Sequence, residues 1–235
     1  MDRKKFIRNS ILGIASLATA SKLLESCSKS DNDDTNTNSS DGSCTVSPAE
    51  TKGPFPIKTP SQLVLENIKS DRIGVALLIN LIIENKNNNC APLESVFVDV
   101  WHCDKDGNYS EYGGTSMQQT DYTSVHFLRG RQTTNSKGEV SFLSIFPGWY
   151  QGRAPHVHVE VLSASGTSLL VTQIAFPETV SSEVYSSTNY ASHGQADTSN
   201  TKDNVFSDSL ADELATLTGN LTDGYTLSKT ITVKA

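Results

Sequence analysis

Short runs of β-branched and apolar residues, separated by turn-forming residues, dominate the chain from about residue 44 onward. Within these runs apolar and polar positions alternate, or valine and isoleucine predominate, which is typical of strands. Turn-forming pairs such as Asp106-Gly107, Lys137-Gly138 and Ser165-Gly166 lie between the runs. The pattern predicts strands at residues 75–84, 95–101, 139–145, 156–162, 168–176 and 225–233.

A helix is expected only at residues 207–217, where Ser207 or Asp208 is available as its cap. No internal repeat is evident. Many short strands with little helix indicate an all-β fold, an antiparallel sandwich or barrel that occupies residues 44–235.

The first 26 residues have the pattern of a secretory leader, with a basic start followed by an apolar run at 11–20. Leu24-Glu25-Ser26-Cys27 resembles a bacterial lipobox, in which Cys27 would be lipidated. Arg3-Lys4-Lys5-Phe6-Ile7-Arg8 also resembles a twin-arginine motif with lysine as the second basic residue, so Sec and twin-arginine export both stay open. Residues 27–43 are rich in Ser, Asn and Asp and are expected to form a flexible tether. We therefore expect a lipid-anchored protein of the bacterial cell envelope.

Composition narrows the class of partner. The formal net charge is −7, and 36% of the residues are hydrophobic. A chain with this apolar share can form a core, whereas its acidic balance argues against binding to nucleic acid, which needs clustered basic residues. No stretch approaches the roughly 20 apolar residues that cross a bilayer, so the lipid anchor would be the only membrane contact.

Beyond Cys27 the chain has three cysteines, Cys44, Cys90 and Cys103. An odd number allows one internal disulfide and leaves one thiol, and the sequence leaves the pairing open. There is no CxxC pair, which disfavours a zinc site built from thiolates.

His156 and His158 flank one residue at the start of a predicted strand, so their imidazoles lie on the same face. Taken alone, most such pairs are polar residues of a strand face. Two turns add Tyr109 and Tyr150 to the same region, although each tyrosine by itself is more often a packing residue. Two phenolates with two imidazoles suit a hard, highly charged ion such as ferric iron better than zinc or copper(I).

These motifs resemble those of the intradiol ring-cleavage dioxygenases, the superfamily of protocatechuate 3,4-dioxygenase and catechol 1,2-dioxygenase. The resemblance runs from about Cys44 to Ala235. It rests on Glu50-Thr51-Lys52-Gly53-Pro54-Phe55, on residues 98–110, on Phe127-Leu128-Arg129-Gly130 and above all on residues 146–159, which include PGWY and RAPHVHV. It implies the antiparallel β-sandwich core of that family, with iron held between sheet and loops.

The resemblance also implies a site and a reaction. The ligands of a non-heme Fe(III) would be Tyr109, Tyr150, His156 and His158, with Tyr150 displaced by substrate. Arg153 would stabilise charge on the substrate ring, and Gln173 would orient the intermediate. The substrates would be a small aromatic diol and O2, both of whose atoms enter a muconate-type diacid, as in aromatic compound catabolism. The sequence departs from the family at Phe55-Pro56, where tyrosine often follows the Gly-Pro pair, which bears on ring specificity.

Two other interpretations are kept. A lipoprotein with the same sandwich could capture catecholates or iron without turnover, but it would not need Arg153 and Gln173. Two histidines on one strand also occur in zinc hydrolases and cupin-like sites, which the two tyrosines disfavour. His102, His126 and His193 belong to no such pattern and are expected to be structural or exposed.

Overall fold

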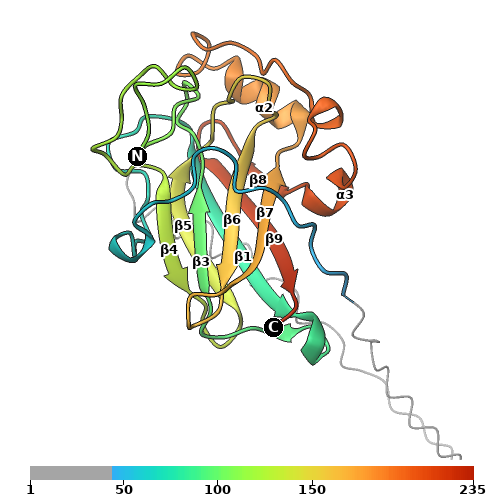
Figure 1. Ribbon diagram of the computed structural model, residues 1–235. Coiled ribbons are helices and arrows are strands. Elements are labelled where there is room, and N and C mark those ends of the chain that lie inside the picture. Colours follow the sequence, from blue (N-terminus) through green and yellow to red (C-terminus); the bar gives the residue numbers. More distant parts are fainter. Residues whose placement is uncertain (1–43) are drawn as a thin grey trace, which may run out of the picture. The chain divides into compact units, whose positions relative to one another are not determined.

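The domain is a sandwich of two β-sheets (Figure 1), seen in a computed structural model that describes residues 44–235. Sheet A has the order β4-β3-β6-β7, and sheet B has the order β2-β1-β9-β8 with β5 also pairing with β1. The all-β sandwich predicted from the sequence is confirmed, and its strands pair antiparallel except for β1 and β9, which are parallel. The strands of sheet A are β3 (Phe97–Trp101), β4 (Arg129–Thr133), β6 (His156–Leu162) and β7 (Ser168–Ala175). Those of sheet B are β1 (Ala76–Asn85), β2 (Ala91–Pro92), β5 (Glu139–Ile145), β8 (Thr216–Asn220) and β9 (Gly224–Val233).

The core lies between the sheets and is built from alternate residues of each strand. In β1 every second residue from Leu77 to Ile83 is buried, and these side chains join one cluster with Val157, Val159 and Val161 of β6. The valines therefore point into the core, as their alternation with the histidines predicts. Burying one such side chain fully stabilises the fold by roughly 1.5–3 kcal/mol.

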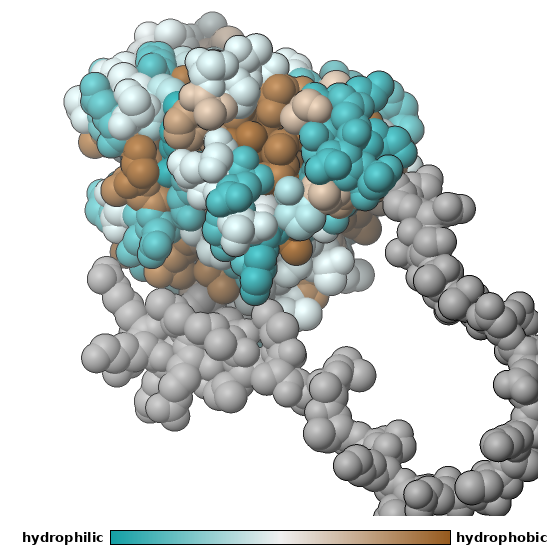
Figure 2. Space-filling view, turned by 90° about the horizontal axis from the view of Figure 1, so that it is seen from below, coloured by the Kyte–Doolittle hydropathy of each residue, from teal (hydrophilic) through white to brown (hydrophobic). Residues whose placement is uncertain are grey.

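The helices are short and lie at one end of the sandwich together with long loops (Figure 1). They are α2 (Glu178–Tyr185) and α3 (Leu210–Glu213). The 3-10 turns are η1 (Pro60–Gln62), η2 (Lys86–Asn88) and η3 (Asn200–Lys202), of which η2 lies at the opposite end beside the C-terminus. Within residues 44–235 no helix has the length and apolar character needed to span a membrane. Viewed from below, this domain shows hydrophobic side chains interspersed with hydrophilic ones (Figure 2).

All six strand predictions are confirmed within two residues at each end, and two of them, 139–145 and 156–162, match β5 and β6 in full. The predicted helix at 207–217 is wrong over most of its length, because only Leu210–Glu213 is helical. The Ala215 N–H donates to the Ala175 carbonyl, and the chain then enters β8, so pairing with neighbouring strands ends the helix. The strands β2, β4 and β8 and the helix α2 were not predicted.

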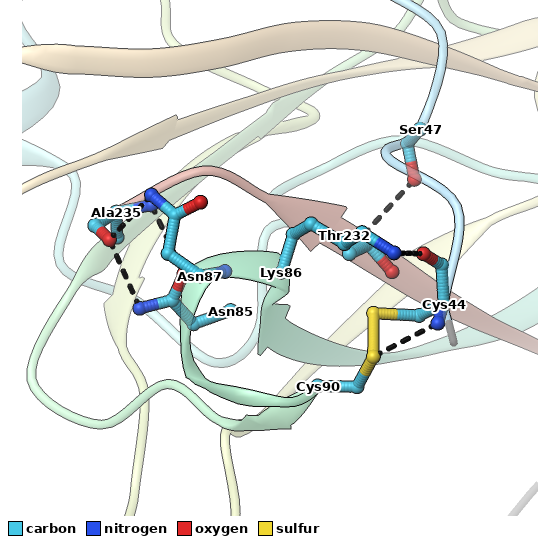
Figure 3. The surroundings of a disulfide bond; sticks show 8 residues. All are labelled: Cys44, Ser47, Asn85, Lys86, Asn87, Cys90, Thr232 and Ala235. Carbon is cyan, nitrogen blue, oxygen red and sulfur yellow. Dashed lines mark hydrogen bonds between the residues drawn. A yellow bond between two sulfur atoms is a disulfide. The ribbon is translucent and has the colours of Figure 1, made fainter. Parts of the chain in front are cut away.

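The first described segment, residues 44–58, runs from sheet B to sheet A, and we call it the strap. A disulfide joins Cys44 to Cys90, and the Thr232 N–H of β9 donates to the Ser47 hydroxyl (Figure 3). The Ser47 N–H in turn donates to the Thr232 carbonyl. Farther along, the Glu50 N–H donates to the Val171 carbonyl of β7. The cysteine pairing that the sequence leaves open is therefore Cys44–Cys90, while Cys103 is a free, buried thiol. The predicted leader, Cys27 and the tether at 27–43 lie outside the described residues.

Candidate active site

The two histidines predicted as ligands stand side by side at the start of β6. Both side chains are buried, and their Nε2 atoms face each other at 3.0 Å. The intervening Val157 points into the core, so the strand geometry places both imidazoles on the other face, toward the loops. Strand alternation thus creates a pair of ring nitrogens aimed at one point.

Tyr109 reaches the same point from the loop that follows β3. Its hydroxyl lies 3.3 Å from Nε2 of His156, and its side chain is buried. The loop is held by Gln118, which accepts the Tyr109 N–H at 2.7 Å and donates to the Tyr109 carbonyl at 2.8 Å. A tight turn precedes it, in which the Asp104 carboxylate accepts the N–H groups of Asp106 and Asn108. Three of the four predicted ligand side chains therefore converge.

Tyr150 lies next to this group but points its hydroxyl elsewhere. Its ring packs against the Tyr109 ring with centroids 6.1 Å apart, and its hydroxyl donates to the Met117 carbonyl at 2.8 Å. The preceding Gly148 brings the Tyr150 turn against the Tyr109 loop, because its N–H donates to the Asp104 carbonyl. A Cβ at this position would lie 2.5 Å from that carbonyl oxygen, so only glycine fits.

The protonation states suit metal binding. Burial, reinforced by the charge of Arg153, lowers the pKa of His156 to about 3, and burial also holds the pKa of His158 well below its usual value. Both imidazoles are therefore neutral at pH 7, which is the form that binds metal ions. The Nδ1 of His156 lies 2.6 Å from the Ala154 carbonyl, which assigns the ring proton to Nδ1 and leaves Nε2 with a free lone pair.

The pKa of Tyr109 shifts in the direction opposite to those of the two histidines. Burial raises the pKa of its hydroxyl well above the usual value, so the phenol keeps its proton unless a cation lies beside it. Two neutral nitrogens and one phenol oxygen facing a common point form a donor set that a hard, highly charged cation would satisfy. Within residues 44–235 no group of three or more His, Cys, Asp or Glu side chains is arranged to hold a metal ion.

Arg153 and Gln173 are brought together beside the histidines. Gln173 pairs with His158 across β6 and β7, and its side-chain oxygen accepts from Arg153 Nη2 at 2.6 Å. The Gln173 amide in turn donates to the Thr51 carbonyl of the strap. Asp203, which is fully buried, accepts from Arg153 Nε at 2.9 Å and from the Ala154 N–H at 2.6 Å. Sheet, strap and the loop at 203 therefore fix this arginine.

The sequence did not point to three residues that hold the side chains of the candidate site in place: Asp203, Trp101 and Gly53. Trp101 stacks on His158, and Gly53 of the strap lies against the same ring. Trp101 and Gly53 lie inside the motifs that carry the family resemblance, and this position could have marked them as residues of the site. Asp203 lies in a polar stretch of the sequence, outside those motifs, where nothing marks it as a residue of the site.

The other histidines lie apart from the converging donor atoms. His102 is buried and contacts the Cys103 carbonyl and the Ser144 hydroxyl, which makes it structural as expected. His126 contacts the Glu111 carboxylate at the surface. His193 packs on the Trp149 ring.

Comparisons with protein families, solved structures and curated proteins all find dioxygenases. A family model described as Dioxygenase matches residues 55–205, more than half of the chain. An intradiol ring-cleavage dioxygenase from Tetranychus urticae is similar in structure, with a TM-score of 0.73 and 29% identity over 81% of this chain and 95% of that one. A 3-chlorocatechol 1,2-dioxygenase from Rhodococcus opacus 1CP shares the fold, with a TM-score of 0.55 and 19% identity over 80% of this chain and 72% of that one.

Among curated proteins, a chlorocatechol 1,2-dioxygenase from Rhodococcus opacus is 27% identical over 110 residues. This match covers 39% of the present chain and 40% of the relative, so the aligned region spans about two-fifths of that enzyme's length.

Proposed function

The chain belongs to the intradiol ring-cleavage dioxygenases, and from this membership we propose that it cleaves a catechol-type ring at a non-heme Fe(III) site. The reaction joins the two atoms of O2 to the two adjacent hydroxyl-bearing carbons, breaks the bond between those carbons and yields a muconate-type diacid. Because the substrate supplies the electrons, the reaction needs no external reductant. The observation that carries the proposal is the convergence of the Tyr109 hydroxyl with Nε2 of His156 and of His158.

Tyr109, His156 and His158 would hold the iron, together with Tyr150. Bound Fe(III) supplies Lewis acidity toward the catechol oxygens and lowers the pKa of the tyrosine hydroxyls. His156 presents an unprotonated Nε2 because its Nδ1 proton is donated to the Ala154 carbonyl. Tyr109 is enclosed on all sides, which makes it the tyrosine that stays in place when substrate enters.

Tyr150 would be the tyrosine that substrate displaces. Two features support this role: its side chain is only partly buried, and its hydroxyl already has an alternative partner in the Met117 carbonyl at 2.8 Å. The Tyr150 side chain would take a proton from the incoming catechol and, as a neutral phenol, would donate a hydrogen bond to the Met117 carbonyl. Tyr150 would thus act as the base for substrate binding.

Arg153 and Gln173 would act on the ring during oxygen attack. The Arg153 guanidinium is held by Asp203 and Gln173 and lies close enough to His156 to lower the pKa of that imidazole. A fixed positive charge at this place stabilises negative charge that develops on the substrate. Gln173 orients Arg153 and, through it, the substrate.

The test is oxygen uptake with a panel of catechols, catechol and hydroxyquinol included, using iron-loaded protein. We expect one O2 consumed per diacid formed, and a red-brown colour from tyrosinate-to-iron charge transfer. Tyr150→Phe and His158→Ala should abolish uptake while circular dichroism stays unchanged. Tyr122→Phe is the matched control, because Tyr122 packs on Phe127 outside the cluster. Catechol binding without oxygen uptake would refute the proposal in favour of a binding protein.

We propose further that the protein works in the cell envelope, anchored by lipid on Cys27. The Cys44–Cys90 disulfide supports this location, because such bonds persist in oxidising compartments and are rare in the cytosol. Cys27→Ala should move the protein from the membrane fraction to the soluble fraction. An unchanged distribution would contradict the anchor.

A further inference from the structure

The two histidines are held in different ways. Nδ1 of His156 contacts the Ala154 carbonyl at 2.6 Å. Nδ1 of His158 is buried and has no hydrogen-bond partner among residues 44–235. Histidines that bind metal ions almost always donate the second ring N–H to a carbonyl, carboxylate or water, which fixes the orientation of the ring. His158 lacks this restraint, so packing has to fix its orientation.

Trp101 supplies a flat surface against the His158 ring. The two rings are parallel, with an interplanar angle of 1° and centroids 4.8 Å apart. The contact follows from the sheet, because Trp101 of β3 and His158 of β6 are directly paired in the antiparallel register. Trp101 is itself almost fully buried, so its indole cannot rotate away without disturbing the core around it.

Gly53 closes on the other atoms of the same ring. A Cβ built on Gly53 would lie 3.2 Å from Cε1 of His158 and 3.7 Å from Nε2. Gly53 has a φ of +65°, a conformation that glycine adopts without the strain other residues incur. The strap cannot easily retreat here, because the Thr51 carbonyl accepts from Gln173 and the Phe55 ring stacks on Tyr109 at 4.7 Å.

We propose that Trp101 and Gly53 are positioning residues for His158, which together replace the missing hydrogen bond at Nδ1. The indole sets the plane of the ring, and the strap backbone at Gly53 sets how far the Cε1–Nε2 edge extends toward His156. This inference rests on the proposed function, since it assigns these residues a role in holding the iron ligand. Neither residue contacts the substrate in this proposal.

Substitutions at Trp101 or Gly53 are expected first to weaken the retention of iron, and to lower turnover only as a consequence. Loss of a group that orients a metal-binding histidine typically weakens metal binding roughly 10- to 100-fold. Trp101→Leu removes the flat surface, and Gly53→Ala pushes a methyl group against Cε1. Trp101→Phe keeps an aromatic face and should restore most of the affinity.

The experiment loads each purified full-length variant with Fe(III) and follows release to a competing chelator by loss of the charge-transfer band. The electron paramagnetic resonance spectrum of the ferric ion provides a second readout, because its rhombicity reports ligand geometry. Gly166→Ala is the matched control: Gly166 also has a positive φ, +84°, but a Cβ there meets nothing within 4 Å. It reproduces the backbone strain without the contact to His158.

We expect Gly53→Ala and Trp101→Leu to release iron at least tenfold faster than wild type, with an altered resonance spectrum. Gly166→Ala and Trp101→Phe should stay within about threefold of wild type. If Trp101→Leu does not fold, Gly53→Ala decides, since Gly53 lies in the strap outside the main core. Wild-type release and an unchanged spectrum in Gly53→Ala would overturn this inference alone. Failure of the wild type to bind Fe(III) would instead overturn the proposed function.

Discussion

The disulfide at the start of the strap gives a stability prediction that can be worked from the chain itself. Replacing Cys44 and Cys90 together by serine removes the cross-link and leaves the strap attached by the Ser47–Thr232 and Glu50–Val171 hydrogen bonds. Because these contacts persist in the native state, the perturbation acts mainly on the unfolded chain. We therefore expect a loss of stability without loss of the site.

The magnitude follows from the length of the loop. The cysteines are 46 residues apart, and the entropy of closing a loop of that length corresponds to about 4 kcal/mol at 25 °C. A domain of this kind has a free energy of unfolding of roughly 5–15 kcal/mol, so the loss is a large fraction of the total. The loss is largest when the native geometry is relaxed around the bond.

The assay is chemical denaturation of the wild type and of the double serine variant, each with and without a phosphine reductant. The reductant should lower the free energy of unfolding of the wild type to that of the variant and leave the variant unchanged. Iron affinity, measured under native conditions, should be the same in both proteins. A difference below about 1 kcal/mol, or loss of iron binding in the folded variant, would refute the reasoning.

Two further predictions concern buried carboxylates. Asp203→Ala leaves the Arg153 guanidinium and the Ala154 N–H without their acceptor and should destabilise the fold by about 3–5 kcal/mol in urea titrations; a loss under 1 kcal/mol would contradict the assigned role. Burial, with the nearby Glu50 charge, raises the pKa of Glu213 from 4.5 to about 7. The native state thus favours the protonated acid, and stability falls as pH rises from about 4.5 to 7. Glu213→Gln should gain up to about 3 kcal/mol relative to wild type at pH 8 and nothing at pH 4; equal effects at both values would exclude this titration.

Much of the sandwich could be predicted because its central strands carry their own pattern. The alternation in residues 156–162 places three valines in the core and two histidines toward the loops, and the structure has this arrangement. The strand β4 was missed because its sequence, RGRQT, has little β-branched content and forms by pairing with β3. Its register depends on a partner outside the segment, which a local pattern does not reveal.

The helix at 207–217 was overextended for a related reason. Its sequence permits a helix, but Leu214 and Ala215 form a bridge to the end of β7 and Thr216 joins β9. Tertiary pairing therefore decided the conformation. In contrast, α2 contains Thr and Ser residues that disfavour helix in isolation and is held by packing of Val184 and Tyr185 on the core.

The sequence pointed to the side chains of the candidate site, but it did not determine how each of them is oriented. Tyr109, His156 and His158 converge as expected, but the sequence could not show that the Tyr150 hydroxyl bonds to Met117. The sequence also left the pairing of the cysteines open, because the disulfide depends on how the strap at Cys44 meets the turn at Cys90 between β1 and β2. Contacts between distant segments, such as that of Asp203 with Arg153, leave no local signature.

The parallel pair of β1 and β9 has a consequence for the order in which the domain is assembled. The last strand lies inside sheet B, between the first strand and β8, so the sheet is divided until residues 224–233 have been synthesised. On the ribosome, β1 can pair with β5 early, but its other edge stays unpaired until β9 has been synthesised. Sheet B therefore closes only after residues 224–233 have emerged, and until then one edge of β1 lacks its partner strand and is open to wrong pairing.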